Sequence, residues 1–329
     1  MEKITAAITG VGSYVPDYRL TNQELETMVE TNDEWIVSRT GIKERRILKD
    51  ENAGTSFMAI RAAEALIENH NVDPQSIELV IVCTASPDLK AASTAVYTAS
   101  QIGATNAFGF DLDAACSSFL YGMSVAARYI ESGKYKRVLL IGADKCSSFI
   151  DYTDRATCII FGDGAGAVLF EPNTEGYGIQ DEELRSDGVG REFLNVKAGG
   201  SLLHTTEDTV KQGLHYVRQD GKTVFKQAVS KMADISEMIL EKNNITHSDI
   251  QWMAAHQANK RIIDATANRL GIEKDKVLIN IENYGNTTSA TLPLLIADFE
   301  KQFKKGDRIL FTTFGGGFTW GAMIVTWAY

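Results

Sequence analysis

Asp113-Ala114-Ala115-Cys116-Ser117-Ser118-Phe119-Leu120 places one cysteine where an apolar strand gives way to a helix. The apolar run at 107–112 predicts the strand, and apolar residues at helical spacing predict a helix from about Cys116 to a stop at Gly133. A thiol in the first turn of a helix faces unpaired backbone N–H groups and the positive end of the helix dipole, and both favour the thiolate. Cys116 is therefore a candidate nucleophile, although a small buried apolar cysteine would show the same pattern.

The composition is typical of a packed α/β protein. The chain has 329 residues, 44% of them hydrophobic, with 27 Gly and only 5 Pro, so it is long enough to build a large core. A formal net charge of −10 argues against a nucleic-acid partner, which would favour a basic face. The cysteines form no CxxC pair, so we expect reduced thiols and no disulfide framework or metal site: Cys83, Cys116, Cys146 and Cys158.

No segment of the sequence has the pattern of a signal peptide or a membrane span. The apolar run at the start is too short for a signal peptide, and no later run approaches the length that a bilayer requires. We therefore expect a cytoplasmic protein with no membrane partner.

The order of predicted elements occurs twice along the chain. The first series has a helix at 56–69, a strand at 77–83, a helix at 93–102, a strand at 107–112 and the helix after Cys116. The second series has a helix at 224–243, a strand at 250–256, a helix at 259–270, a strand at 276–280 and a helix from about 287. Each series ends in a strand, a glycine turn and a further strand, at 138–142 with 161–166 and at 308–311 with 314–317. We interpret the chain as one α/β unit used twice, with halves at 1–172 and 173–329.

This repeat makes a prediction about which side chains meet. If the halves pack about a pseudo-twofold axis, the strand end that carries Cys116 faces the matching region at 283–286. His256 ends the equivalent of the 77–83 strand, at the carboxyl edge where α/β sheets place their ligand sites. We therefore expect Cys116, His256 and Asn286 to converge. Taken singly, His256 could be a structural histidine and Asn286 a helix cap.

A series of motifs extends this pattern over nearly the whole chain. They are Asn32-Asp33-Glu34-Trp35-Ile36, Arg39-Thr40-Gly41-Ile42, Ala114-Ala115-Cys116, Phe161-Gly162-Asp163-Gly164-Ala165-Gly166, His256-Gln257-Ala258-Asn259, Tyr284-Gly285-Asn286-Thr287 and Phe314-Gly315-Gly316-Gly317-Phe318-Thr319-Trp320-Gly321. In this order and spacing the chain resembles the β-ketoacyl-acyl carrier protein synthase III family of the thiolase superfamily, condensing enzymes that start fatty-acid chains. The resemblance implies a five-layered αβαβα fold of two duplicated halves and a homodimer.

The resemblance also implies a two-step reaction. An acyl group moves from an acyl-coenzyme A thioester to Cys116, with the tetrahedral oxyanion held by the N–H groups of Cys116 and Gly316. Malonyl-acyl carrier protein then loses CO₂, and His256 and Asn286 donate hydrogen bonds to the enolate oxygen. The carbanion attacks the acyl group on Cys116 and gives a 3-ketoacyl product. Both thioesters are substrates, and no cofactor or metal is implied.

Two features separate subfamilies of this fold. Elongating ketosynthases use cysteine with two histidines, whereas the priming type uses cysteine, histidine and asparagine, as here. Thiolases carry a second catalytic cysteine near the C-terminus, and no cysteine follows Cys158 in this chain. Priming from coenzyme A is therefore favoured over thiolysis, and elongation from acyl-carrier primers stays open.

Residues for binding the two carriers follow from the resemblance. Trp35 and Arg155 would hold the adenine of coenzyme A between them, with Arg39 beside it and Asn259 in the pantetheine tunnel; Trp35 could equally be a core aromatic. Docking of the acidic carrier protein would use a basic patch, although such charges also occur on solvated helix faces: Lys226, Lys260, Arg261 and Arg269.

The chain departs from the family at Ala91 and Ala92, where many members have Phe-Pro. That phenylalanine crosses the dimer interface and closes the end of the acyl pocket. Its loss would free volume for a primer larger than acetyl, in fatty-acid or specialised lipid or polyketide biosynthesis. Tyr97 or Leu202 could refill the space.

Two other classes of function stay open. One is an acyltransferase that passes the acyl group to an oxygen or nitrogen nucleophile without decarboxylation. The other is a non-catalytic thiolase-fold partner subunit, which would not need Cys116.

Overall fold

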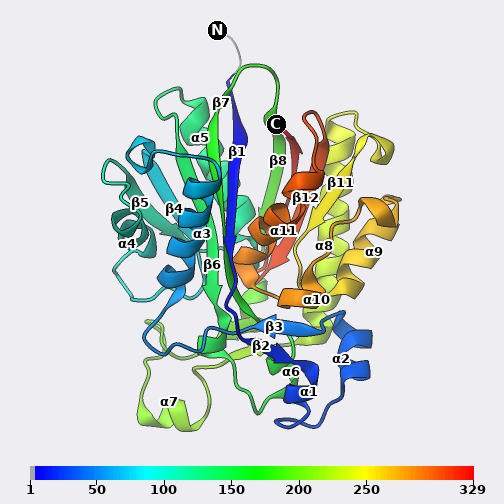
Figure 1. Ribbon diagram of the computed structural model, residues 1–329. Helices are drawn as coiled ribbons and strands as arrows, with labels where there is room; N and C mark the ends of the chain where they lie inside the picture. The colour runs from blue at the N-terminus through cyan, green and yellow to red at the C-terminus, as the bar shows by residue number, and fades with distance from the viewer. Residues whose placement is uncertain (1–3) are drawn as a thin grey trace.

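The structure, a computed structural model, describes residues 4–329 and contains two main β-sheets (Figure 1). Residues 1–3 lie outside this range. They begin the apolar run that the sequence analysis found too short for a signal peptide. The first sheet has the order β1 (Thr5–Tyr14), β7 (Asp163–Asn173), β6 (Val138–Lys145), β4 (Leu79–Cys83) and β5 (Phe108–Leu112). The second has the order β11 (Trp252–Ala255), β12 (Arg308–Gly315), β13 (Thr319–Thr326) and β8 (Gly178–Ser186). Strand β4 is parallel to β5 and β6, β11 is parallel to β12, and the other pairs within these two sheets are antiparallel.

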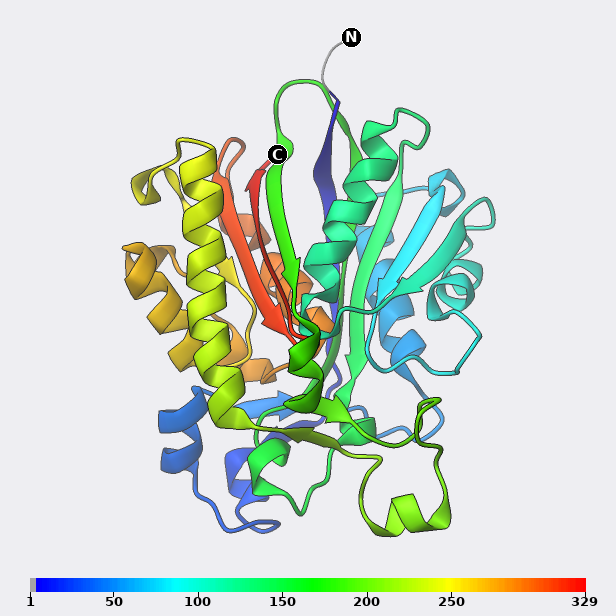
Figure 2. The same ribbon diagram turned by 180° about the vertical axis from the view of Figure 1, so that it is seen from behind.

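Helices separate the two sheets and cover their outer faces. Helices α5 (Ser118–Glu131) and α11 (Thr291–Phe299) lie between the sheets. Helices α3 (Thr55–Asn69) and α4 (Thr94–Gln101) cover the first sheet, and α8 (Gly221–Lys242) and α9 (Lys260–Leu270) cover the second, as the view from behind also shows (Figure 2). The expected αβαβα order of five layers is confirmed.

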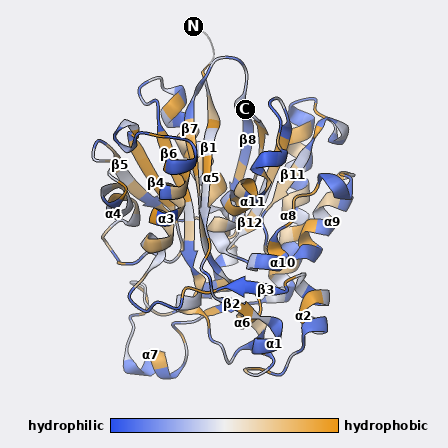
Figure 3. Cartoon of the chain, viewed as in Figure 1, coloured by the Kyte–Doolittle hydropathy of each residue, from blue (hydrophilic) through white to orange (hydrophobic). Residues whose placement is uncertain are grey.

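The core follows from the apolar faces of these layers. The buried side chains of α5 recur at helical spacing, so Phe119, Met123 and Ile130 pack among residues of both sheets. Each fully buried side chain of this kind stabilises the fold by about 1.5–3 kcal/mol. Figure 3 shows hydrophobic residues along the strands and hydrophilic residues over much of α7 and α9. Among the helices formed by residues 4–329, none combines the length and apolar character needed to cross a bilayer.

One expected strand, at 276–280, is wrong. The segment begins in a 3-10 turn at Lys274–Lys276 and pairs with β11 only through an isolated bridge between Met253 and Val277. The backbone N–H of Asn280 donates to Oε1 of Gln257 instead of to a neighbouring strand. A side chain therefore replaces the hydrogen bonds that would extend the second sheet.

Short elements gather at one end of the sheets, at the bottom of Figure 1. They include two small paired sheets, β2 (Arg19–Thr21) with β3 (Glu44–Arg46) and β9 (Leu194–Val196) with β10 (Val217–Gln219). The short helices are α1 (Asn22–Leu25), α2 (Asp33–Thr40), α6 (Arg155–Cys158), α7 (Glu207–Lys211) and α10 (Ile281–Tyr284).

Candidate active site

Cys116 lies in a tight turn between β5 and α5. The turn is a 3-10 segment at Ala115–Ser117, and α5 begins at Ser118, two residues later than the pattern predicted. Ala115 has a φ of 50°, which is strained for a residue with a side chain. Asp113 Oδ1 accepts a hydrogen bond from Ala115 N at 2.8 Å, and Ser118 Oγ accepts one from Ala114 N at 2.7 Å. These bonds hold the turn that presents the thiol.

The protonation state of Cys116 differs from the expectation. Cys116 is only 7% exposed, and burial raises the pKa of its thiol to about 12, with a smaller contribution from the negative charge of Asp144. The backbone N–H groups of Cys116 and Gly316 lower the pKa but do not compensate. The predicted preference for thiolate is therefore wrong for the unliganded protein, because desolvation outweighs the helix terminus. The same two N–H groups are those that the resemblance assigns to the oxyanion.

His256 follows β11 directly, and its backbone N–H donates to Thr312 O at 2.9 Å. The side chain is 2% exposed. Its Nδ1 lies 2.6 Å from Thr291 Oγ1, whereas its Nε2 has no hydrogen-bond partner among the described residues. Burial lowers the pKa of His256 to about 3, so the imidazole is neutral at physiological pH.

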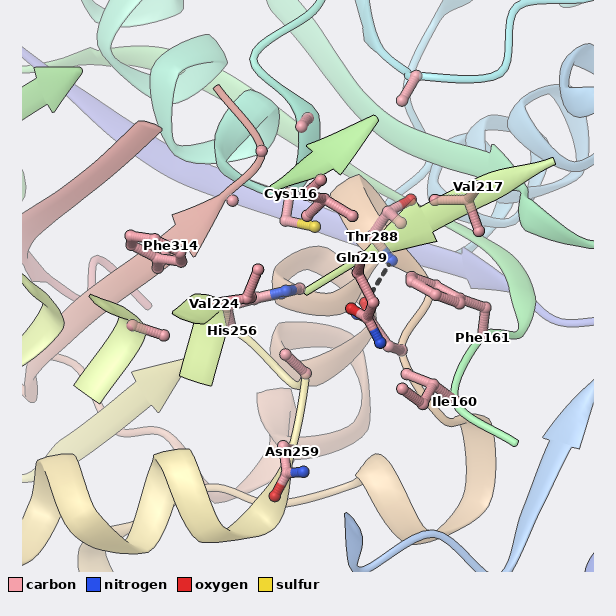
Figure 4. A pocket seen from close by; sticks show the side chains of 18 of the residues that line it. Cys116, Ile160, Phe161, Val217, Gln219, Val224, His256, Asn259, Thr288 and Phe314 are labelled. Atoms are coloured by element: carbon pink, nitrogen blue, oxygen red, sulfur yellow. Dashed lines mark hydrogen bonds between the residues drawn. The ribbon is translucent and has the colours of Figure 1, made fainter. Parts of the chain in front are cut away.

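Asn286 is fixed through both its backbone and its side chain. Its N–H donates to Ile160 O at 2.9 Å, and its carbonyl accepts from Gly162 N at 3.1 Å, so the two halves of the chain meet here. Its Oδ1 accepts from Thr288 N at 2.9 Å, the bond dashed in Figure 4. Because the amide oxygen is engaged in this way, the Nδ2 donor stays available to a ligand.

The structure brings Cys116, His256 and Asn286 to the wall of one cavity of about 400 Å³. Figure 4 shows Cys116 and His256 in this cavity. Much of the remaining wall is apolar, and the part formed by β9, β10, α8 and the chain around the end of β12 includes Leu194, Val196, Val217, Val224, Phe225, Ala228, Met232, Phe314, Gly315 and Gly316. A mainly apolar cavity with a few converging polar groups is typical of a ligand site.

Gly315 allows the end of β12 to approach the nucleophile. A Cβ at Gly315 would lie 2.8 Å from Cys116 N and 3.0 Å from Cys116 Cβ, closer than a methyl group can pack. This glycine therefore serves close approach of two backbones. Gly316 lies next to it on the cavity wall and has more room.

Three residues that the sequence analysis did not single out support the site. Thr288 and Thr291 orient Asn286 and His256, and Asp144 holds the segment from which both threonines come. Asp144 is the second-to-last residue of β6 and follows a run of buried apolar residues, which is a signal that could have identified it. The two threonines carry no comparable signal.

The residues expected to bind coenzyme A lie together at the end of the sheets where the short elements gather. The guanidinium of Arg155 lies 5.0 Å from the ring centroid of Trp35, and that of Arg39 lies 6.0 Å from it. Asn259 lines the cavity and donates to Arg39 O at 3.0 Å. Trp35 is half-buried: it packs against a core cluster, and part of its side chain is exposed to solvent.

The cations expected to dock the carrier protein differ in their pairing. Lys260 pairs with Asp264, and Arg269 pairs with Asp234 and Glu237. Arg261 lies over the ring of Phe225, 5.1 Å from its centroid, and the exposed Lys226 has no acidic partner within residues 4–329.

Ala91 and Ala92 do not line the cavity that holds Cys116. Both are exposed, and Ala92 borders a separate cavity of about 950 Å³ together with Tyr97 and Leu89. Leu202 is 80% exposed. A role for these residues in an acyl pocket therefore needs a second copy of the chain.

Comparisons with known proteins are consistent across sequence and structure. Residues 110–188 match the family described as 3-oxoacyl-[acyl-carrier-protein (ACP)] synthase III, and residues 240–327 match the family of its C-terminal part. The chain is 56% identical to β-ketoacyl-[acyl-carrier-protein] synthase III 2 of Bacteroides thetaiotaomicron, over 100% of this chain and 98% of the relative. It is 52% identical to a β-ketoacyl-[acyl-carrier-protein] synthase III of Porphyromonas gingivalis, with the same coverage. The crystal structure of 3-oxoacyl-[acyl-carrier-protein] synthase III from Aquifex aeolicus superposes with a TM-score of 0.89 at 40% identity, covering 98% of this chain and all of the other.

Proposed function

This chain belongs to the 3-oxoacyl-[acyl-carrier-protein] synthase III family, and we propose that Cys116, His256 and Asn286 carry out its two half-reactions. The chain is a condensing acyltransferase of fatty-acid biosynthesis with a thiolase-like fold. The observation that carries the proposal is that three buried side chains, Cys116, His256 with its unpartnered Nε2, and Asn286, line one cavity. A partner subunit without catalysis would not need this convergence.

In the first half-reaction, the sulfur of Cys116 attacks the carbonyl of an acyl-coenzyme A. The N–H groups of Cys116 and Gly316, which already point to the sulfur region, stabilise the tetrahedral oxyanion. The C–S bond to coenzyme A then breaks, the acyl group stays on Cys116, and the proton lost by the thiol leaves with coenzyme A as its free thiol. Cys116 is 7% exposed, and this burial limits the access of water that would hydrolyse the acyl-enzyme.

In the second half-reaction, malonyl-acyl carrier protein enters the same cavity and loses CO₂. The electron pair of the broken C–C bond moves to the thioester as an enolate, whose oxygen needs hydrogen-bond donors. Nε2–H of the neutral His256 and Nδ2–H of Asn286 supply them, and one such donor typically contributes about 3 kcal/mol. The carbanion attacks the acyl carbonyl on Cys116, and the released sulfur takes up a proton.

The residues proposed to bind the two carriers lie where the short elements gather at one end of the sheets. We assign Trp35, Arg155, Arg39 and Asn259 to coenzyme A. The guanidinium groups of both arginines lie near the indole ring of Trp35, and Asn259 donates a hydrogen bond to the backbone of Arg39. Docking of the acidic carrier protein rests mainly on Lys226 and Arg261, since acidic neighbours already neutralise Lys260 and Arg269.

We propose a homodimer through the edge of the first sheet. Strand β5 is an edge strand with one paired side, and Phe108 on it is 42% exposed. Leu89 and Leu202 are also strongly exposed. A second copy would cover these side chains and bring Ala91 and Ala92 to the acyl end of its partner's cavity, leaving room for a primer larger than acetyl.

The decisive experiment measures intact protein mass after incubation with acetyl-, branched-chain and octanoyl-coenzyme A, for wild type and Cys116→Ala. Malonyl-acyl carrier protein is then added. The proposal predicts that wild type alone gains one acyl mass and discharges it as 3-ketoacyl product with CO₂. Loading without CO₂ release would instead indicate an acyltransferase that does not decarboxylate, and no loading from any donor would contradict the proposal.

A further inference from the structure

We propose that Asp113 is a specificity-determining residue of the cavity, which selects acyl groups that carry a hydroxyl over hydrocarbon chains of the same length. This inference rests on the proposed function and names the class of primer that Cys116 accepts. Asp113 lies shortly before Cys116 in the chain and lines the same cavity.

The acyl chain and coenzyme A leave Cys116 in different directions. The residues proposed for coenzyme A lie on or beside α2 and α9, which pack against each other. Ala85 and Asp113 line the cavity from loops that follow β4 and β5, at the outer edge of the first sheet. Figure 1 shows these two groups of elements on opposite sides of the molecule. With coenzyme A on the side of α2, an acyl group on Cys116 extends toward Asp113.

The carboxyl of Asp113 is fixed in place and keeps one oxygen for a ligand. Its Oδ1 accepts a hydrogen bond from Ala115 N at 2.8 Å, which ties the side chain to the turn that presents the thiol. Among residues 4–329, no group donates to Oδ2 and no cation pairs with the carboxyl. A carboxylate oxygen is an acceptor, so Oδ2 can bind a donor on the acyl group.

The surroundings make that acceptor selective. The side chain of Asp113 is exposed in one copy of the chain, yet nearby protein atoms already displace part of its water and raise the pKa of its carboxyl. A hydrocarbon chain would displace more water from Oδ2 without returning a hydrogen bond, whereas a hydroxyl donates one. The side chains of Ala85, Ala115 and Phe149 also line the cavity and are apolar, so they offer no substitute.

The test compares two donors with the same carbon chain, butyryl-coenzyme A and 3-hydroxybutyryl-coenzyme A, the latter as separate enantiomers. The rate of acyl mass gain on Cys116 is measured with each donor, and the ratio of the two rates is the readout. The ratio is needed because the charge of Asp113 also raises the pKa of Cys116, which affects every donor equally.

Two variants and one matched control are compared with wild type. Asp113→Asn keeps an oxygen for Ala115 N and removes the charge, and Asp113→Leu removes both oxygens. The control is Asp73→Asn, because Asp73 Oδ1 accepts from Gln75 N at 3.0 Å in the same kind of turn but does not line the cavity.

We expect wild type and Asp73→Asn to load one enantiomer of the 3-hydroxybutyryl group about tenfold faster than butyryl. The ratio should fall to about one in Asp113→Leu, because neither donor finds an acceptor there. It should fall about threefold in Asp113→Asn, which removes the charge but keeps a polar group.

Equal or faster loading of butyryl by wild type would overturn the proposal, and so would a ratio that is the same in wild type and Asp113→Leu. If Asp113→Leu does not fold, an unchanged ratio in Asp113→Asn overturns it. Failure of the proposed function has a different signature: wild type gains no acyl mass from any of these thioesters, or it loads them and then releases no CO₂ from malonyl-acyl carrier protein.

Discussion

The carboxylate of Asp144, at the end of β6, accepts a hydrogen bond from Ser289 Oγ at 2.6 Å and thereby joins the first sheet to the segment that orients Asn286 and His256. Asp144 is completely buried. Its two oxygens accept further bonds from Thr84 Oγ1, Ala85 N, Ser86 Oγ, Thr288 Oγ1 and Ser289 N. A buried carboxylate is stable only while its oxygens accept hydrogen bonds, so the donors around Asp144 must keep their present orientation.

Asp144→Asn should therefore weaken both the fold and the condensation step. An amide presents two N–H groups to partners that are themselves donors, so at least one buried donor loses its acceptor. We expect the free energy of unfolding to fall by about 3 kcal/mol, measured by urea denaturation. Decarboxylation should fall more than acyl loading. Asp275→Asn, at an exposed site, is the control and should change neither; a fully stable and active Asp144→Asn would contradict this account.

Gly315→Ala should slow acyl loading. The added methyl would lie 2.8 Å from Cys116 N, so the turn that presents the thiol and the N–H groups must shift. A displacement of about 1 Å at a reacting group can reduce the rate about 100-fold. The measurement is the rate of mass gain with acyl-coenzyme A. Gly188→Ala, with open space around the new methyl, should load like wild type.

The reactivity of Cys116 should depend steeply on pH in the unliganded protein. A thiol pKa of about 12 leaves little thiolate near neutrality. The rate of alkylation by iodoacetamide should therefore rise about tenfold per pH unit between pH 7 and 9, after subtraction of the rate for Cys116→Ala. A plateau near pH 7 would show that the thiolate is stabilised despite burial.

His256 should make the fold less stable in acid. Its pKa is about 3 in the native protein and close to 6.5 when unfolded, so below pH 6.5 the unfolded chain binds a proton that the native protein excludes. Stability is thus complete above pH 6.5 and is lost as pH falls from 6.5 toward 3. Between pH 7 and 5 the loss from this group is about 2 kcal/mol. Urea unfolding at both pH values should show that His256→Asn is less sensitive to acid than wild type; equal slopes would refute this assignment.

Trp35→Ala should raise KM for acyl-coenzyme A about tenfold, equivalent to about 1.4 kcal/mol of lost stacking, with little change in the turnover number. Trp35 lies beside Arg155 and does not line the cavity that holds Cys116, so in the proposed function it meets the nucleotide end of the carrier, away from the reacting thioester. An acyl-pantetheine primer lacks the adenine and serves as the control substrate. If its KM rises equally, Trp35 acts through the fold and not through the nucleotide.

Much of the architecture could be read from local pattern. The helix expected at 56–69 is α3, the strand at 77–83 contains β4, and the helix at 259–270 is α9, because apolar spacing records which face of an element is buried. The strand at 276–280 was wrong because Gln257, distant in sequence, takes a backbone hydrogen bond of that segment. The expected halves at 1–172 and 173–329, the dimer and the carrier-docking surface stay predictions.

For the candidate site, residue type and motif order along the chain were enough to select Cys116, His256 and Asn286. Equivalent strand ends do not explain Asn286, because residues 276–280 form no strand. The burial that raises the pKa of Cys116, the contact between Thr291 and His256 and the hydrogen bond between Ser289 and Asp144 came only from the folded molecule. Each depends on desolvation or on a hydrogen bond between groups far apart in sequence, and packing alone brings such groups within reach.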